Sequence, residues 1–224
     1  MIDNSYTSVY QNDIWALNLE TYEWEVWYQQ PRAKPIGRSW HAAAILEKRL
    51  IISGGYWWDG RNEHYCGDFW EFHFDRKEWN ELFFSTPLNE LPHARNRQSV
   101  IMSQGKCQSL MLIRLLYQII NIVIDNEGRP MMLLMYGNWY STKTRQDLFF
   151  NDVHVFVFDK KASTWSLIAT SKRDSDVKIT GKQPIGRGHQ TVLAYSNLQL
   201  FFFGGEAHRK RYNDMYLIEL NFLK

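Results

Sequence analysis

Two stretches near the end of the chain decide the fold. Residues 198–205 read Leu-Gln-Leu-Phe-Phe-Phe-Gly-Gly, and residues 213–220 read Asn-Asp-Met-Tyr-Leu-Ile-Glu-Leu. The first is an apolar run that ends in two glycines, and glycine accepts the positive φ that a tight turn requires. The second follows an aspartate with large side chains typical of a β-strand. Together they predict two strands joined through a turn and a loop.

The same pattern recurs along the chain. The aspartate-led strand also occurs at residues 12–19, 67–74 and 151–158, and a tryptophan follows these three copies at Trp24, Trp79 and Trp165. A Pro-x-x-Arg tetrad precedes three copies, at residues 35–38, 92–95 and 184–187. The glycine turn recurs at Gly54-Gly55 and, more weakly, at Gly137-Asn138, where we expect Asn138 to substitute for the second glycine. Repetition at long intervals predicts a repeat architecture.

The order of these features strongly resembles the kelch repeat, over nearly the whole chain. The resemblance implies an all-β propeller built from four-stranded antiparallel blades. Physical reasoning agrees, because runs such as Phe156–Phe158 and Phe201–Phe203 are apolar on both faces and need cover on both sides. Blades stacked face to face provide that cover. We expect the repeated tryptophan to lie as a large apolar wedge between blades.

The predicted ring is incomplete. The sequence supplies the last two strands of a first unit, four strands of a second, four of a third and three of a fourth, whereas propellers typically have about four to eight complete blades. We therefore predict a single partial kelch propeller over residues 1–224. Its parts are the end of a blade at 12–28, a blade at 35–84, a blade at 92–170 with an insertion at 104–129, and a blade at 184–224 that lacks its last strand.

The insertion is the main departure from the repeat. The interval from Gln98 to the turn residue Gly137 is 26 residues longer than the interval from His41 to Gly54. Within it, Arg114, Gln118, Asn121 and Asp125 fall on one stripe of an otherwise apolar helix. Three interpretations agree with this pattern: a helical or irregular insertion packed on the propeller, a gene-model error, and a partner-binding helix.

Composition excludes several classes of protein. The formal charge is only +2, from 26 Lys and Arg against 24 Asp and Glu, so we expect neither nucleic acid as a partner nor a dedicated phosphate-backbone surface. Only two cysteines are present, which predicts a reducing compartment, cytoplasmic or nuclear. We expect no membrane association, because the first residues lack the features of a secretory signal and the apolar run 110–124 carries polar residues.

We expect no enzymatic activity, no metal and no cofactor. The chain has no nucleophile elbow, no phosphate loop and no recognised metal-ligand motif. The aspartates Asp13, Asp68, Asp152 and Asp214 are interpreted as capping residues of the architecture. An alternative is that the chain is part of a propeller-based enzyme such as a copper-radical oxidase, a class that also uses kelch-type propellers.

The predicted function is a scaffold that binds a partner protein or peptide through its loop face. Kelch receptors that resemble this pattern use arginines near the channel mouth to hold carboxylates, which implies a ligand with acidic or C-terminal carboxylate groups and binding by Arg38, Arg95 and Arg187. The alternative is that each arginine pairs with an acid of the propeller itself. The segment 37–41 resembles one in substrate receptors of ubiquitin ligases; actin-binding kelch proteins are another alternative. Aromatic side chains beyond the turns complete the predicted binding set: Trp40, Tyr56, Trp57, Trp58, Trp139 and Tyr140.

Overall fold

The fold is built from β-strands alone in the part of the chain that the structure describes. The computed structural model describes residues 9–27, 34–102, 129–141, 144–159, 164–171, 181–194 and 199–219. Within these ranges no helix is long and apolar enough to cross a membrane. The insertion predicted over residues 104–129 lies, apart from Arg129, outside the described residues.

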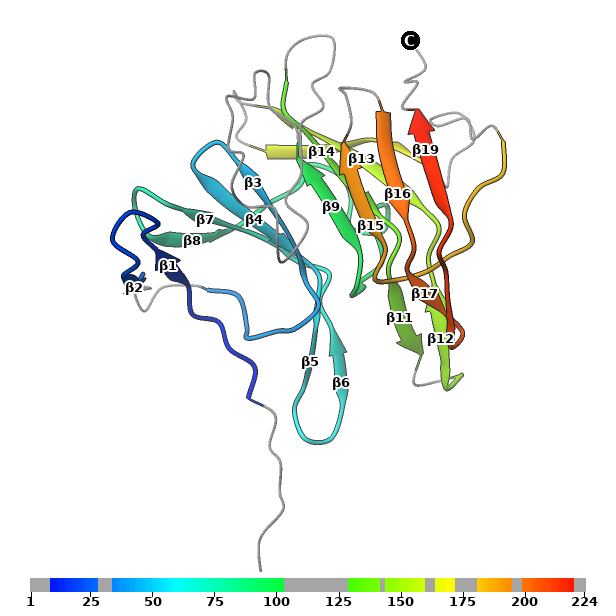
Figure 1. Ribbon diagram of the computed structural model, residues 1–224, viewed down its shortest axis with the longest axis horizontal. Coiled ribbons are helices and arrows are strands. Elements are labelled where there is room, and N and C mark those ends of the chain that lie inside the picture. Colours follow the sequence, from blue (N-terminus) through cyan, green and yellow to red (C-terminus); the bar gives the residue numbers. More distant parts are fainter. Residues whose placement is uncertain are drawn as a thin grey trace, which may run out of the picture.

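The strands form consecutive antiparallel sheets that we call blades 1 to 4, in chain order (Figure 1). Blade 1 contains β1 (Trp15–Leu17) and β2 (Trp24–Val26). Blade 2 contains β3 (Ala42–Leu46), β4 (Arg49–Ser53), β7 (Phe69–His73) and β8 (Glu78–Glu81). Blade 3 contains β9 (Ser99–Met102), β10 (Met131–Met135), β13 (Val153–Asp159) and β14 (Thr164–Thr170). Blade 4 contains β15 (Thr191–Ala194), β16 (Gln199–Phe203) and β19 (Met215–Glu219).

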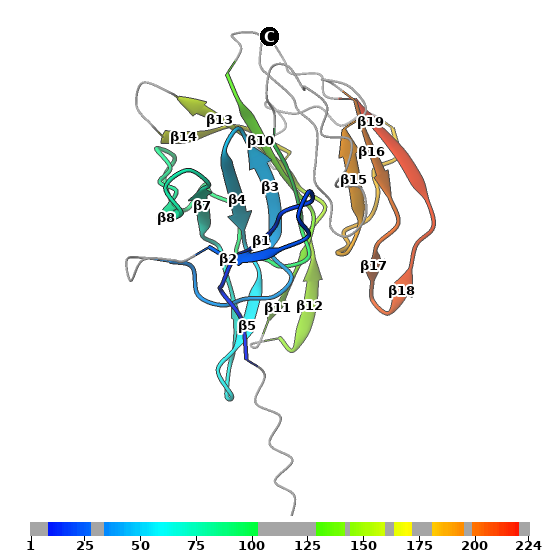
Figure 2. The same ribbon diagram turned by 60° about the vertical axis from the view of Figure 1, so that its left-hand side comes forward.

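Each of blades 2 to 4 also carries a small hairpin between its second and third strands. These hairpins are β5 (Tyr56–Trp58) with β6 (Glu63–Tyr65), β11 (Asn138–Ser141) with β12 (Gln146–Phe149), and β17 (Glu206–Ala207) with β18 (Lys210–Arg211). All three extend from the same end of the sheets, as Figures 1 and 2 show. We call this end the hairpin face.

The first strands of blades 2, 3 and 4 surround a common axis. Strand β9 contacts β3 on one side and β15 on the other. Within each sheet, the later strands lie progressively farther from this axis, in the order in which they occur in the chain. This is the radial arrangement of a propeller, and it confirms the predicted all-β, incomplete kelch-type architecture.

Blade 3 shows why its strands are apolar on both faces. Every side chain of β10 is buried. On β13, Phe156 packs into a core shared with blade 2, whereas Val155 and Val157 pack into a core shared with blade 4. Alternate residues of one strand point to opposite faces, so a blade with a neighbour on each side needs apolar residues at every position. Each such burial contributes roughly 1.5–3 kcal/mol.

Two of the repeated tryptophans lie between blades, as the sequence predicts. In both cases the tryptophan packs against the blade that precedes its own. Trp165 of blade 3 is buried in the core that it shares with Phe69 and Ala44 of blade 2. Trp79 of blade 2 is buried in a core to which Trp27 and Ile14 of blade 1 contribute. Trp24 of blade 1 is 64% exposed, because no earlier blade lies against it in the described part of the chain.

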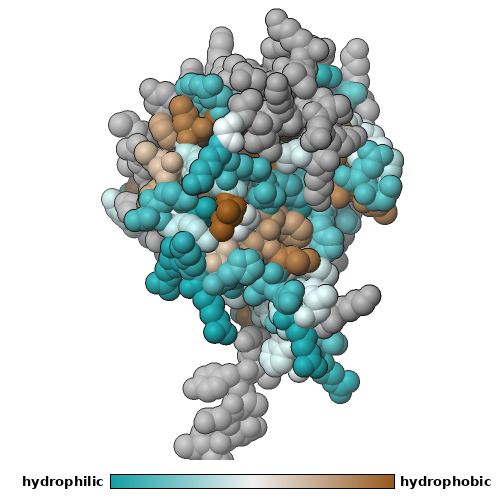
Figure 3. All heavy atoms as spheres, turned by 90° about the vertical axis from the view of Figure 1, so that its right-hand side faces the viewer, coloured by the Kyte–Doolittle hydropathy of each residue, from teal (hydrophilic) through white to brown (hydrophobic). Residues whose placement is uncertain are grey.

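The far side of blade 4 is exposed in the same way. Strand β19 alternates between half-buried residues that face blade 3 and exposed residues that face away from it. Figure 3, which views the molecule from the right-hand side of Figure 1, shows hydrophobic side chains among hydrophilic ones. The large exposed apolar side chains of blade 4's outer side are Leu193, Phe203, Met215 and Leu217.

One turn differs from its sequence-based prediction. In blades 2 and 4 the positive-φ pairs are Gly54-Gly55 and Gly204-Gly205. In blade 3 the corresponding pair is Tyr136-Gly137, with φ of 61° and 102°, so the expectation that Asn138 replaces a turn glycine is wrong by one residue. Tyr136 occupies this conformation because its peptide N–H donates to the Asp152 carbonyl, as Gly204 does to Asp214, and its ring is buried against Phe202.

Candidate functional site

An arginine–aspartate pair ties the beginning of each of blades 2, 3 and 4 to its third strand. The guanidinium of Arg38 donates two hydrogen bonds to the Asp68 carboxylate, at 2.6 and 2.8 Å. Arg95 binds Asp152 at 2.5 and 3.1 Å, and Arg187 binds Asp214 at 2.6 and 3.1 Å. Each arginine also donates to backbone carbonyls, including that of the first residue of the positive-φ pair: Gly54, Tyr136 and Gly204.

These pairs correct the role predicted for the tetrad arginines. Arg38, Arg95 and Arg187 are buried, with 7%, 2% and 1% of their surface exposed. A guanidinium already bound bidentately to a buried or half-buried carboxylate has few donors left for a ligand. The alternative, that each arginine pairs with an acid of its own blade, agrees with the structure. The aspartates are architectural as predicted, but they act as ion-pair partners rather than as turn caps alone.

A third side chain joins each pair from two positions beyond the aspartate. Trp70 donates to Asp68, Tyr216 donates to Asp214, and His154 is hydrogen bonded to Asp152. Burial alone would raise the pKa of Asp152, but the hydrogen bonds from His154 and Arg95 outweigh it and hold the pKa well below its ordinary value. Asp152 is therefore ionised in the folded protein at neutral pH.

The residues that reach the hairpin face at the axis lie two positions after each tetrad arginine. They are Trp40, Arg97 and His189, and all three have a left-handed backbone conformation, with φ of 56°, 55° and 59°. This conformation is uncommon for residues other than glycine. The residue before each of them pairs with the hairpin strand of the same blade, through bridges between Ser39 and Tyr56, Asn96 and Asn138, and Gly188 and Glu206. The bridge holds the following residue close to the axis.

These three residues and Glu206 form what we call the axial cluster. The Arg97 guanidinium lies over the Trp40 ring, 4.3 Å from its centroid. The ring of His189 meets Trp40 edge-on, with centroids 6.4 Å apart. The Glu206 carboxylate lies 3.7 Å from the guanidinium of Arg97 and 3.6 Å from the His189 imidazole. Burial lowers the pKa of His189, and the charge of Arg97 lowers it further.

Sequence reasoning found only part of the axial cluster. Trp40 was predicted as a binding residue, and it is 45% exposed. His189, Arg97 and Glu206 were not among the predicted binding residues. The common offset of two residues from the tetrad arginine is the signal that could have identified Arg97, but the three residue types at this offset differ, so only their positions repeat.

The aromatic residues of the hairpins lie on the hairpin face with different degrees of exposure. Tyr56 is half-buried between Tyr10, Trp40 and Tyr65, with ring centroids 5.4–6.1 Å away. Burial, with a contribution from Glu63, raises the pKa of Tyr56 to about 12.

The outer hairpin residues differ from Tyr56. Trp57 stacks on His64 at 4.0 Å, and Trp58 is 39% exposed near the hairpin tip. Trp139 and Tyr140 on β11 are half-buried, and Trp139 packs against His93. The structure therefore places all six predicted aromatic residues on the hairpin face, while their role in binding stays a prediction.

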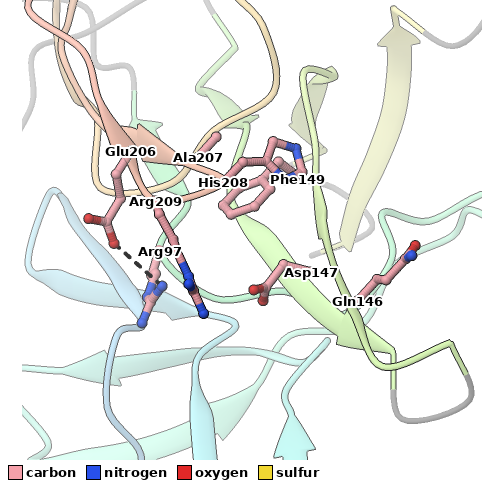
Figure 4. A pocket seen from close by; sticks show the side chains of 8 residues that line it. All are labelled: Arg97, Gln146, Asp147, Phe149, Glu206, Ala207, His208 and Arg209. Atoms are coloured by element: carbon pink, nitrogen blue, oxygen red, sulfur yellow. Dashed lines mark ion pairs between the residues drawn. The ribbon is translucent and has the colours of Figure 1, made fainter.

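A pocket of about 670 Å³ opens between the hairpins of blades 3 and 4 (Figure 4). The axial residue Arg97 forms part of its wall, and Phe149 and His208 lie edge to face with ring centroids 4.8 Å apart. The turn between β17 and β18 consists of His208 and Arg209, with φ of 50° and 63°. Two-residue hairpin turns of this kind favour Asn and Gly. The remaining lining residues are Gln146, Asp147, Glu206 and Ala207.

Comparison with known proteins supports the fold. No family model matches the chain. The chain is 26% identical over 84% of its length to acyl-CoA-binding domain-containing protein 4 of Arabidopsis thaliana, and 26% identical over the same share to acyl-CoA-binding domain-containing protein 5 of that plant. It is 29% identical over 48% of its length to Kelch domain-containing protein 2 of Bos taurus. It covers only 22–27% of these relatives.

The structural comparison agrees. The structure of YjhT, a kelch-type propeller, matches 93% of the chain with a TM-score of 0.54 and 14% sequence identity, and the chain covers 48% of YjhT. At this identity the likeness concerns the fold alone. The chain thus has an incomplete kelch-like propeller fold and spans about half of the solved propeller that it matches.

Proposed function

We propose that the chain is part of a non-catalytic scaffold that binds a partner protein through the hairpin face. The observation that carries this proposal is the arrangement of that face. Three consecutive blades each extend a hairpin and one axial side chain from the same end of a rigid stack of sheets. Rigid scaffolds that present variable loops at one end are a common basis for recognition.

The composition of the face supports a protein partner. Trp40 and Trp58 are exposed. Trp40 contacts the half-buried Tyr56 and the Arg97 guanidinium, and Arg209 lines the pocket on the same face. Tryptophan, tyrosine and arginine are the residue types that contribute most at protein interfaces. The left-handed backbone conformations of Trp40, Arg97 and His189 also support a binding role. Unfavourable backbone conformations persist only where the surrounding structure enforces them, and they are enriched at functional sites.

Finer assignments stay predictions from the kelch resemblance. They include a substrate receptor of a ubiquitin ligase, an actin-binding protein, and a ligand with acidic or C-terminal carboxylate groups. The cytoplasmic or nuclear location stays a prediction from the two cysteines. The alternative to a scaffold is a propeller-based enzyme. A metal analysis of the purified protein tests this alternative, and stoichiometric copper or iron would favour the enzyme. Among the described residues, no group of three or more His, Cys, Asp and Glu side chains is placed to hold a metal ion.

Site-specific photocrosslinking tests the proposal. A photoreactive phenylalanine analogue replaces Trp58 on the hairpin face in one variant and Lys48 in a second. Lys48 lies in the turn between β3 and β4 at the opposite end of blade 2, and its side chain is 75% exposed. We expect the Trp58 variant to form discrete adducts with a cellular protein that the Lys48 variant lacks. Equal labelling from both positions, or none from Trp58, contradicts the proposal.

A further inference from the structure

The pocket between the hairpins of blades 3 and 4 has the dimensions of a ligand site. Its volume of about 670 Å³ falls within the usual range of roughly 300–1,000 Å³ for such sites. Its walls come from hairpin β11–β12, hairpin β17–β18 and the axial residue Arg97. Phe149 and Ala207 supply apolar surface, and the other lining side chains are polar.

Charges in the pocket are balanced and only partly paired. Arg97 interacts with Trp40 and lies 3.7 Å from Glu206, which is too long for a hydrogen bond. Its Nε is buried without a hydrogen-bond partner among the described residues. Arg209 and Asp147 take part in no ion pair with one another or with any other described residue, and the Asp147 carboxylate accepts only a long hydrogen bond of 3.5 Å from the Asn138 side chain among them. Figure 4 shows their charged groups facing each other across the pocket.

Such a pair of facing groups fits a ligand that both accepts and donates. A carboxylate bound by Arg209 would also lie near the carboxylates of Asp147 and Glu206, which repel it. An ammonium group bound by Asp147 would face two guanidinium groups. A neutral amide avoids both repulsions, because its carbonyl accepts a hydrogen bond from Arg209 while its N–H donates one to Asp147.

We infer that this pocket binds the neutral side-chain amide of a glutamine or asparagine in a peptide segment, between Arg209 and Asp147. The inference rests on the proposed function, since the peptide segment belongs to the partner. It differs from the carboxylate ligand that the kelch resemblance implies. Phe149 provides the apolar surface against which the methylene groups of such a side chain pack.

Titration with three short peptides tests the inference. The probes are acetyl-Gly-Gln-Gly-amide, its nearly isosteric glutamate analogue and its lysine analogue, which share one backbone and differ in side-chain charge. Binding is followed by NMR from the backbone amide signals of Phe149 and Ala207 in the purified chain. We expect the glutamine probe to shift both signals saturably and to bind more tightly than the other two probes.

Three variants assign the binding groups. Arg209→Ala and Asp147→Asn each remove one of the facing charges, and we expect each to weaken the glutamine probe about tenfold. Lys210→Ala, in the same hairpin but outside the pocket lining, is the matched control and leaves binding unchanged. The inference is overturned if the glutamate or the lysine probe binds as tightly as the glutamine probe or more tightly, or if the glutamine probe causes no saturable shift.

The two proposals fail in different ways. If the glutamine probe does not bind while Trp58 still forms its specific crosslink, the amide site is wrong and the scaffold function stands. If the probe binds but the crosslink is absent, the pocket recognises amides and the hairpin face is not the partner surface.

Discussion

The Arg97 guanidinium lies over the ring of Trp40 with its central carbon 4.3 Å from the ring centroid, although the two residues belong to neighbouring blades. A cation held over an indole in a partly desolvated position is worth roughly 0.5–2 kcal/mol. The contact joins the axial ends of blades 2 and 3 and orients Arg97 toward the pocket. It therefore connects the packing of the propeller to the candidate binding face.

The buried pair Arg95–Asp152 is expected to be critical for stability. Arg95→Ala leaves the Asp152 carboxylate buried without its arginine partner, and removing one member of a buried ion pair costs about 3–5 kcal/mol. Urea denaturation followed by tryptophan fluorescence measures the loss. The control is Lys48→Ala, whose ion pair with Asp75 is exposed and is worth less than about 1 kcal/mol. Similar midpoints for the two variants would show that the buried pair does not stabilise the blade.

Stability is expected to fall in acid because of the same carboxylate. The pKa of Asp152 is lowered in the folded protein, whereas an unfolded aspartate titrates near 3.9. The folded state therefore binds fewer protons, and the stabilising effect is present above about pH 4 and decreases as the pH falls further. Denaturation midpoints between pH 7 and pH 3 measure this dependence. Asp152→Asn should be less stable at pH 7 and should show a smaller loss in acid, and an unchanged loss would contradict the assignment.

The tryptophan wedge between blades 2 and 3 predicts a large difference between equivalent positions of the repeat. Trp165→Ala creates a cavity in a buried core and is expected to cost about 3–5 kcal/mol. Trp24→Ala removes the corresponding side chain of blade 1, which is 64% exposed, and is expected to cost less than about 1 kcal/mol. Thermal unfolding of both variants compares them directly. Equal losses of stability would mean that the contribution of this tryptophan does not depend on a neighbouring blade.

The exposed apolar side of blade 4 predicts self-association of the isolated chain. Met215 and Leu217 are 67% and 52% exposed on β19, at positions equivalent to Phe69 and Glu71, which are buried in blade 2. Met215→Lys combined with Leu217→Lys should increase the monomer fraction in size-exclusion chromatography with light scattering. The same two charges should leave the β-sheet circular dichroism unchanged. If the double variant has the same monomer fraction as the unchanged protein, the surface that causes association lies elsewhere.

The sequence pattern identified the blades because the pattern is local. A strand between two neighbours needs apolar residues on both faces, and this requirement is visible in runs such as Phe156–Phe158 whatever their partners are. The tryptophan at a nearly constant distance from each aspartate is equally readable. The turn of blade 3 was placed one residue late, because a buried tyrosine at Tyr136 takes the conformation that elsewhere belongs to glycine.

The candidate site depended on contacts that the pattern does not contain. Trp40 could be chosen as an exposed aromatic residue near a turn. Arg97 and Glu206 can be recognised as site residues only from their contacts, since Glu206 lies next to both Arg97 and His189. These residues come from different blades, and the identities at the shared offset differ. Their meeting follows from the curvature of the stack around its axis.

The repeat by itself determined that this protein folds into stacked antiparallel sheets, because strands that are apolar on both faces need cover on both sides and neighbouring copies of the same unit supply it. The tertiary structure alone decided which arginines are buried in bidentate ion pairs and which line the hairpin face. Arg38, Arg95 and Arg187 meet aspartates 30, 57 and 27 positions further along the chain, whereas Arg97 and Arg209 remain at the hairpin face. Each of these ion pairs forms only when the beginning and the third strand of one blade come together, because its two residues are far apart in the sequence.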